Sequence, residues 1–146
     1  MRRGARVCAE YYFTRLQYSG YGGRGWGRDR WLTDWPEADY HFMQGVRRLT
    51  GIDAAEGGRY VNALSEELFD YPWIYAVEVG GWDLSEEEAA RLREYLLRGG
   101  FLYVDDFHGG EEWAGFVESM QRVFPDRPIV DIPADDEVMH VLYDLD

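Results

Sequence analysis

Alternating and continuous apolar residues mark the expected strands of this chain. Aromatic and polar residues alternate between residues 11 and 18, which predicts a first β-strand. Two nearly continuous apolar runs, at residues 73–79 and 101–104, are typical of strands that are covered on both faces. A further strand is expected at residues 128–132. Weaker strand signals lie at residues 52–55 and 60–64.

Helical spacing of apolar residues separates these strand signals. Residues 37–50 and 111–124 each place their apolar side chains on one helical face. Ser85-Glu86-Glu87-Glu88 forms a capping box, so a helix is expected from there to Arg98, ended by Gly99-Gly100. One helical turn is expected at residues 65–69.

The order of these elements predicts the fold class. Strands that alternate with helices imply parallel strands joined by right-handed crossovers. We therefore expect a three-layer α/β domain, an open, mainly parallel sheet with helices on both faces, of flavodoxin-like type. Strands 74–79 and 101–104 are expected to be adjacent, parallel and central. A length of 146 residues suits a single domain, 1–146, of which residues 1–10 are expected to be flexible.

The composition excludes several classes of protein. The 15 basic and 28 acidic residues leave a net charge of −13, which argues against nucleic acid as a partner because phosphate is repelled. No apolar run approaches about 18 residues, so no membrane-spanning helix is expected. Every basic residue is an arginine, which excludes lysine-based catalysis. The single cysteine, Cys8, excludes an internal disulfide and a cysteine-based zinc site.

The residues that follow the expected strands are the candidates for a site. Open α/β sheets bind ligands beyond the carboxyl ends of their strands, near the point where the strand order reverses. Acids, a histidine, arginines, glycines and tryptophans converge on this edge: Trp26, Arg28, Arg30, Trp31, Glu78, Gly80, Gly81, Trp82, Asp105, Asp106 and His108.

Asp105, Asp106 and His108 form the sharpest cluster. Two carboxylates and an imidazole within four residues can hold a hard divalent metal, or can serve as acid and base. The structural alternative is that Asp106 caps the next helix, Asp105 accepts hydrogen bonds from loop amides and His108 is solvated.

Glu78 and the glycine-rich loop at residues 20–27 each leave two interpretations open. A carboxylate in the most apolar strand needs a partner or must be neutral. Arg15, Arg28 or Arg30 would supply that partner, or Glu78 is an acid of the site. The loop lacks the ending of a phosphate-binding loop, and it is either a lid that stacks on a ligand or an aromatic segment that packs on the body.

Several stretches resemble a bacterial family called domain of unknown function 4159. They comprise residues 13–18, 25–39, 68–75 and 92–106, and the resemblance runs from about Tyr12 to the end. Its most specific part is Leu-Arg-x-Tyr-Leu-x-x-Gly-Gly-Phe-Leu-x-x-Asp-Asp at residues 92–106. The resemblance implies a fold like the class I glutamine amidotransferases and the trehalose-utilisation-type proteins. In those relatives the strand after a Gly-Gly pair leads to the functional residue, and here the strand after Gly99-Gly100 leads into Asp105-Asp106.

Two departures from the family pattern limit what the resemblance implies. The family tends to carry Asp-His-Pro where this chain has Asp135-Asp136-Glu137. Members usually continue past residue 146, so the C-terminal part of the family domain is expected to be missing. No secretion signal is recognisable, while members often look exported, so the compartment stays open between the bacterial envelope or periplasm and the cytoplasm.

These observations lead to two hypotheses about function. The first is an amidotransferase-like domain without the cysteine nucleophile, a pseudoenzyme without a cofactor that binds a small molecule or a protein partner at the carboxyl edge, or assembles into a homo-oligomer. Its ligand would contact Trp26, Arg28, Arg30, Trp31, Gly80, Gly81 and Trp82. The alternative is a metal-dependent or acid–base hydrolase of a polar, sugar-like substrate, in which Asp105, Asp106, His108 and Glu78 would be catalytic. Asp105, Asp106 and His108 would then bind the divalent metal.

Overall fold

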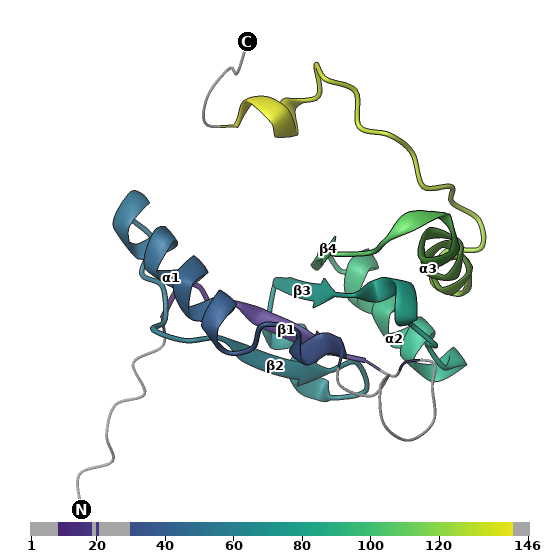
Figure 1. Ribbon diagram of the computed structural model, residues 1–146, viewed down its shortest axis with the longest axis horizontal. Helices are drawn as coiled ribbons and strands as arrows, with labels where there is room; N and C mark the ends of the chain where they lie inside the picture. Colours follow the sequence, from purple (N-terminus) through teal and green to yellow (C-terminus); the bar gives the residue numbers. More distant parts are fainter. Residues whose placement is uncertain (1–8, 19, 21–29, 142–146) are drawn as a thin grey trace, which may run out of the picture.

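The structure is a computed structural model that describes residues 9–18, 20 and 30–141 (Figure 1). Its strands are β1 (Thr14–Gln17), β2 (Arg59–Asn62), β3 (Trp73–Val77) and β4 (Phe101–Asp105). Its α-helices are α1 (Glu37–Leu49), α2 (Glu86–Leu97) and α3 (Gly109–Val123). Short 3₁₀ helices are η1 (Arg30–Leu32), η2 (Glu66–Asp70), η3 (Val79–Gly81) and η4 (Glu137–His140). The N-terminal segment expected to be flexible lies, except for residues 9 and 10, outside the described residues.

The described strands form one parallel sheet in the order β2-β1-β3-β4. The expected α/β class and parallel pairing are therefore confirmed. The chain moves outward from β1 to β2 and then crosses to β3 on the other side of β1. The strand order thus reverses between β1 and β3, where ligands bind in open sheets of this kind.

Helices cover both faces of the sheet, as expected. Side chains alternate between faces along a strand, so Ile74 and Ala76 of β3 pack in the larger core with residues of α2 and α3. On the opposite face Phe13, which directly precedes β1, packs against Met43 of α1. Figure 1 shows α1 apart from the α2–α3 pair. None of the helices in the described ranges combines the length and apolarity that a bilayer span requires.

Local signals in the sequence placed most boundaries correctly. The Ser85 hydroxyl accepts a hydrogen bond from the Glu88 N–H and the Glu88 carboxylate accepts one from the Ser85 N–H, which confirms the capping box of α2. Gly99 ends the helix with φ +95°, a conformation that glycine adopts without strain. The helical turn expected at residues 65–69 is η2.

The expectation that the two apolar strands are central and covered on both faces is wrong for β4. The strands are adjacent and parallel, as expected, with Ile74 opposite Leu102. However, β4 lies at the edge of the described sheet, and its Phe101 and Tyr103 side chains are 55% and 47% exposed. The β4 side chains are exposed because the apolar cluster beside α1 extends to Trp73 and Tyr75 of β3 and includes no residue of β4.

The strands expected at residues 128–132 and 52–55 do not form in the described chain. Residues 128–132 have no regular secondary structure and are exposed, and no described strand pairs with them. Pro128 and Pro133 bound this segment and have no N–H to donate to a neighbour. In the second segment only Ala54 makes a β-bridge, to Tyr11.

Candidate functional site

The carboxyl edge of β3 and β4 is formed by two matching turns. Val77 and Asp105 are opposite each other in the ladder, and the Glu78 N–H donates to the Asp105 carbonyl over 3.1 Å. The next residues, Glu78 and Asp106, both adopt left-handed backbone conformations with φ 57° and 59°. The backbone therefore turns at the same level of the sheet after β3 and after β4. Glu78 follows β3 and does not lie within it.

These turns bring Glu78, Asp106 and His108 together. One ligand atom from each residue lies within 4.8 Å of the others, and His108 Nε2 lies 3.0 Å from Asp106 Oδ1. Neither aspartate caps α3, because the cap position is His108, without a side-chain hydrogen bond. The sequence predicted a cluster of Asp105, Asp106 and His108. In the structure the third member of the cluster is Glu78 and not Asp105.

Arg30 neutralises part of this acidic edge. Its Nη1 lies 3.6 Å from Glu78 Oε2 and 3.3 Å from Glu112 Oε1, so Arg30 is the partner that Glu78 requires. Glu112 also accepts a 2.7 Å hydrogen bond from the His108 N–H. This bond, together with Arg30, lowers the pKa of Glu112 although partial burial opposes the shift.

Gly80 and Gly81 allow these side chains to approach the turn. A Cβ on Gly80 would lie 2.3 Å from the Glu112 Cβ, and one on Gly81 would lie 2.8 Å from Arg30 Nη1. The side chains of Glu112 and Arg30 therefore lie against the two glycines, which are partly exposed.

The tryptophans expected to contact a ligand lie in the core or outside the described residues. Trp82 is fully buried between the rings of Tyr18 and Phe116, and Trp31 is also buried. Trp26 and Arg28, like most of the glycine-rich loop, are outside the described residues. Neither Trp31 nor Trp82 is exposed to a ligand at this edge.

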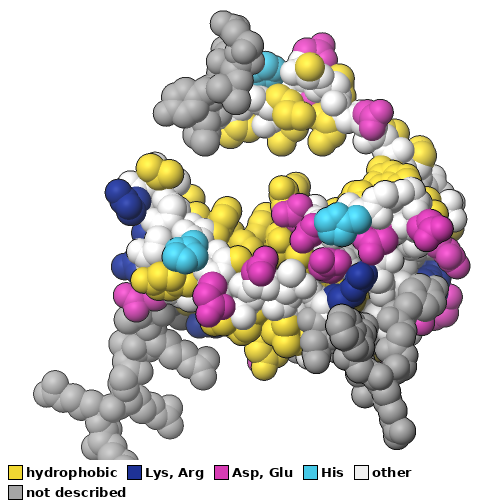
Figure 2. All heavy atoms as spheres, viewed as in Figure 1, with side chains coloured by type: hydrophobic (Ala, Val, Ile, Leu, Met, Phe, Trp, Pro, Cys, Tyr) yellow, Lys and Arg dark blue, Asp and Glu magenta, His cyan; other side chains and the backbone are white. Residues whose placement is uncertain are grey.

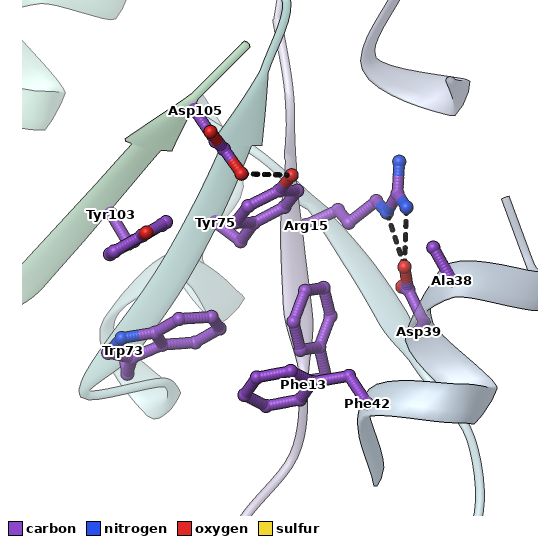
Figure 3. A pocket seen from close by; sticks show the side chains of 9 residues that line it. All are labelled: Phe13, Arg15, Ala38, Asp39, Phe42, Trp73, Tyr75, Tyr103 and Asp105. Atoms are coloured by element: carbon purple, nitrogen blue, oxygen red, sulfur yellow. Dashed lines mark hydrogen bonds and ion pairs between the residues drawn. The ribbon is translucent and has the colours of Figure 1, made fainter. Parts of the chain in front are cut away.

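Asp105 lies on the other face of the sheet, at one end of a hollow of about 440 Å³ (Figure 3). The Tyr75 hydroxyl donates to Asp105 Oδ2 over 3.4 Å, and Oδ1 accepts from the Asp106 N–H. Burial, together with the charge of Asp105, raises the pKa of Tyr75 to about 12. The hollow is lined by Phe13, Arg15, Ala38, Asp39, Phe42, Trp73, Tyr75, Tyr103 and Asp105.

Aromatic rings form most of the hollow. Trp73, Tyr75 and Tyr103 lie within 28° of parallel, with ring centroids 5.9–6.3 Å apart. Phe13 and Phe42 meet edge to face on the α1 side. Figure 2 shows hydrophobic side chains gathered in this hollowed part of the surface. Trp73 and Tyr75 are two residues apart in β3, and this spacing is the sequence signal that they share a face of the sheet. The signal is hard to recognise because the residues on the other face of β3 are also apolar.

Arg15 and Asp39 form the floor of the hollow beneath α1. Both side chains are buried, and Arg15 Nε and Nη2 lie 2.8 and 2.5 Å from Asp39 Oδ1. Arg15 Nη1 donates to the carbonyls of Trp31 and Thr33. Burial raises the pKa of Asp39, and the Arg15 guanidinium opposes that shift. Four of the five guanidinium N–H groups are thus used within the protein, so this arginine is not free to clamp a ligand.

The fold and this edge define a parallel α/β domain with a polar cluster on one side and an aromatic hollow on the other. Residues 12–146 match the family model described as Domain of unknown function (DUF4159). The chain therefore belongs to this family, and the resemblance read from its motifs is confirmed. A search of the curated proteins finds no significant match.

Proposed function

We propose that this chain is a non-catalytic domain that binds a small molecule, with a flavodoxin-like topology similar to that of the class I glutamine amidotransferases. The observation that carries the proposal is the hollow of about 440 Å³ over β1, β3 and β4. Its volume falls within the usual range of small-molecule sites. It covers a face of β1 and β3, between which the strand order reverses, and its Asp105 end reaches the carboxyl edge, where open α/β sheets commonly bind ligands.

The lining of the hollow favours a particular ligand chemistry. The aromatic rings suit a flat, apolar body, and the Asp105 carboxylate at one end suits a cationic or hydrogen-bond-donating group. The net charge of −13 favours a cation and disfavours an anion. The ligand is therefore an aromatic or similarly flat molecule with a positively charged group.

The absence of a nucleophile at the end of β4 supports binding rather than amide transfer. The strand that would carry the nucleophile leads into Asp105-Asp106-Phe107-His108. None of these side chains is the cysteine or serine that acyl transfer by a covalent route would require.

Three probes that share an indole ring test this proposal by ¹H–¹⁵N NMR titration. We expect tryptamine, a cation, to bind more tightly than neutral indole, and indole more tightly than the anion indole-3-acetate. Asp105→Asn should reduce the affinity for tryptamine to that for indole, and Tyr103→Ala should weaken all three. Glu87→Gln, at an exposed position of α2 on the opposite face, is the matched control and should change none. Affinities that are equal for all three probes, or unaffected by Tyr103→Ala, would contradict the proposal.

A second candidate function is a metal-dependent hydrolase of a polar, sugar-like substrate. It is favoured by the convergence of Glu78, Asp106 and His108 within 4.8 Å, since two carboxylates and an imidazole suit Mn²⁺ or Zn²⁺. A metal there would supply an acidified water for hydrolysis. Arg30, 3.6 Å from Glu78, disfavours a cation at this place, so the binding function ranks first.

Calorimetry with Mn²⁺ and Zn²⁺ tests this second candidate. His108→Ala and Glu78→Gln should each abolish binding, while Asp105→Asn should leave it unchanged. Asp105→Asn distinguishes the two clusters, because Asp105 belongs to the cluster predicted from the sequence and not to the one found in the structure. If the unaltered protein gave no heat of binding with either metal, the hydrolase candidate would be overturned. The proposed binding function of the hollow would not be affected.

A further inference from the structure

The open side of the hollow has an exposed apolar rim. We define the rim as Phe42 of α1 with Phe101 and Tyr103 of β4, whose side chains are between 47% and 55% exposed. Three large aromatic side chains around one concavity form a surface that water solvates poorly. A complementary apolar surface would gain free energy by covering it.

The C-terminal segment of the chain offers such a surface. We define the tail as residues 128–141, which are exposed along their whole length. The backbone hydrogen bonds of its turns are formed within the tail itself. The N–H groups of Asp136 and Met139 donate to the carbonyls of Pro133 and Asp136. Its exposed apolar side chains are Ile129, Val130, Ile132, Val138, Met139 and Val141.

The path of the tail brings these two surfaces to the same side of the molecule. In Figure 1 the tail leaves the end of α3 and curves back above α1 and β4, with η4 over the open side of the sheet. Figure 2 shows hydrophobic side chains of the tail and of the body facing each other across the hollowed space. Apolar surface therefore borders the space on both sides.

Charge also fits this arrangement. The tail is acidic, through Asp131, Asp135, Asp136 and Glu137. The last turn of α1, the helix that carries the rim residue Phe42, contains Arg47 and Arg48. Both arginines are exposed, and among the described residues Arg47 forms an ion pair with the exposed Glu56 at 3.5 Å. Opposite charges thus flank the two apolar surfaces.

We propose that the tail closes onto the rim and forms the roof of the hollow. Val138 and Met139 of η4 would pack on Tyr103 and Phe42, while the acidic residues would lie beside Arg47 and Arg48. The closed state turns an open groove into an enclosed site, from which a ligand would leave only when the tail opens. The proposal goes beyond the binding function and does not depend on it, because no ligand takes part in the closure.

The occupant is the tail of the same molecule rather than a second copy. Two copies that each carry a net charge of −13 repel one another. A tethered segment, in contrast, has an effective concentration in the millimolar range at its own rim. Intramolecular closure is therefore favoured at ordinary protein concentrations.

Disulfide trapping tests the closure. In a Cys8→Ser background, Val138→Cys is combined with Tyr103→Cys on the rim, or with Ala90→Cys on the exposed side of α2 as the matched control. Mild oxidation should trap the rim pair rapidly as a monomer, at a rate that does not change on dilution, and the control pair far more slowly. Equal rates for the two pairs would overturn the proposal. Trapping mainly as a dimer, at a rate that falls on dilution, would show instead that a second copy is the occupant.

Hydrogen exchange measured by mass spectrometry provides a test without altering the rim. The double variant Val138→Ser, Met139→Ser should accelerate exchange in the peptide that contains β4, and Arg48→Glu should do so to a smaller degree. Exchange in α2 is the internal control and should stay constant. Unchanged exchange in β4 for both variants would overturn the closure, whatever the indole probes show for the hollow.

Discussion

At the scale of single residues, the buried pair of Arg15 and Asp39 ties α1 to β1. We expect Asp39→Ala to lower the free energy of unfolding by about 3–5 kcal/mol, because it leaves the buried guanidinium without its partner. Glu56→Ala breaks the exposed Arg47–Glu56 pair instead and should cost less than about 1 kcal/mol. Urea denaturation of both variants measures the difference. Equal losses would show that the buried pair does not stabilise the fold in this way.

Glu112 should contribute a pH-dependent part of the stability. Its pKa in the folded protein is below the ordinary value of 4.5, so its contribution is present above pH 4.5 and is lost as the pH falls through the lower, folded value. Glu112→Gln should therefore flatten the dependence of the unfolding free energy on pH below 4.5. Glu111→Gln, at the exposed neighbouring position, is the control. If the unfolding free energy fell equally steeply below pH 4.5 with and without Glu112, this carboxylate would not be the source of the pH dependence.

At the scale of elements, the same substitution should have opposite signs in a helix and in a tight turn. Gly45 lies inside α1, and no atom lies within 4 Å of the place that an alanine methyl would take, so Gly45→Ala should stabilise the protein by about 0.5–1 kcal/mol. Gly80 lies in η3, where a Cβ would meet the Glu112 side chain at 2.3 Å, so Gly80→Ala should cost about 1–3 kcal/mol. Thermal melts of the two variants measure both signs. A Gly80→Ala protein as stable as the parent would show that Glu112 can move aside freely.

At the scale of the whole molecule, the excess of acidic residues should make stability depend on salt. A net charge of −13 repels itself in the compact state. Raising the ionic strength from about 0.01 M to 0.15 M shortens the screening length from about 30 Å to 8 Å. The melting temperature at neutral pH should therefore rise over this range of sodium chloride. A constant or falling value would mean that attractive ion pairs, such as Arg91–Glu66, outweigh the net repulsion.

The sequence by itself determined the elements whose signals are local. The capping box at Ser85 and the glycine at position 99 fix the two ends of α2, because each acts through atoms a few residues away. The apolar runs around α2 then predicted two adjacent parallel strands. The same reasoning predicted that acids would gather at the carboxyl edge, because parallel strands end on the same side of a sheet.

Only the tertiary structure decided which face each side chain occupies and how well that face is covered. An apolar run is compatible with cover on both sides, so the sequence could not reveal that α1 leaves Tyr75 and Tyr103 beside an open hollow. Left-handed turns after β3 and β4 place Glu78 with Asp106 and His108, whereas strand alternation carries Asp105 to the opposite face. These positions depend on packing between residues that are distant in the sequence, and no local pattern encodes them.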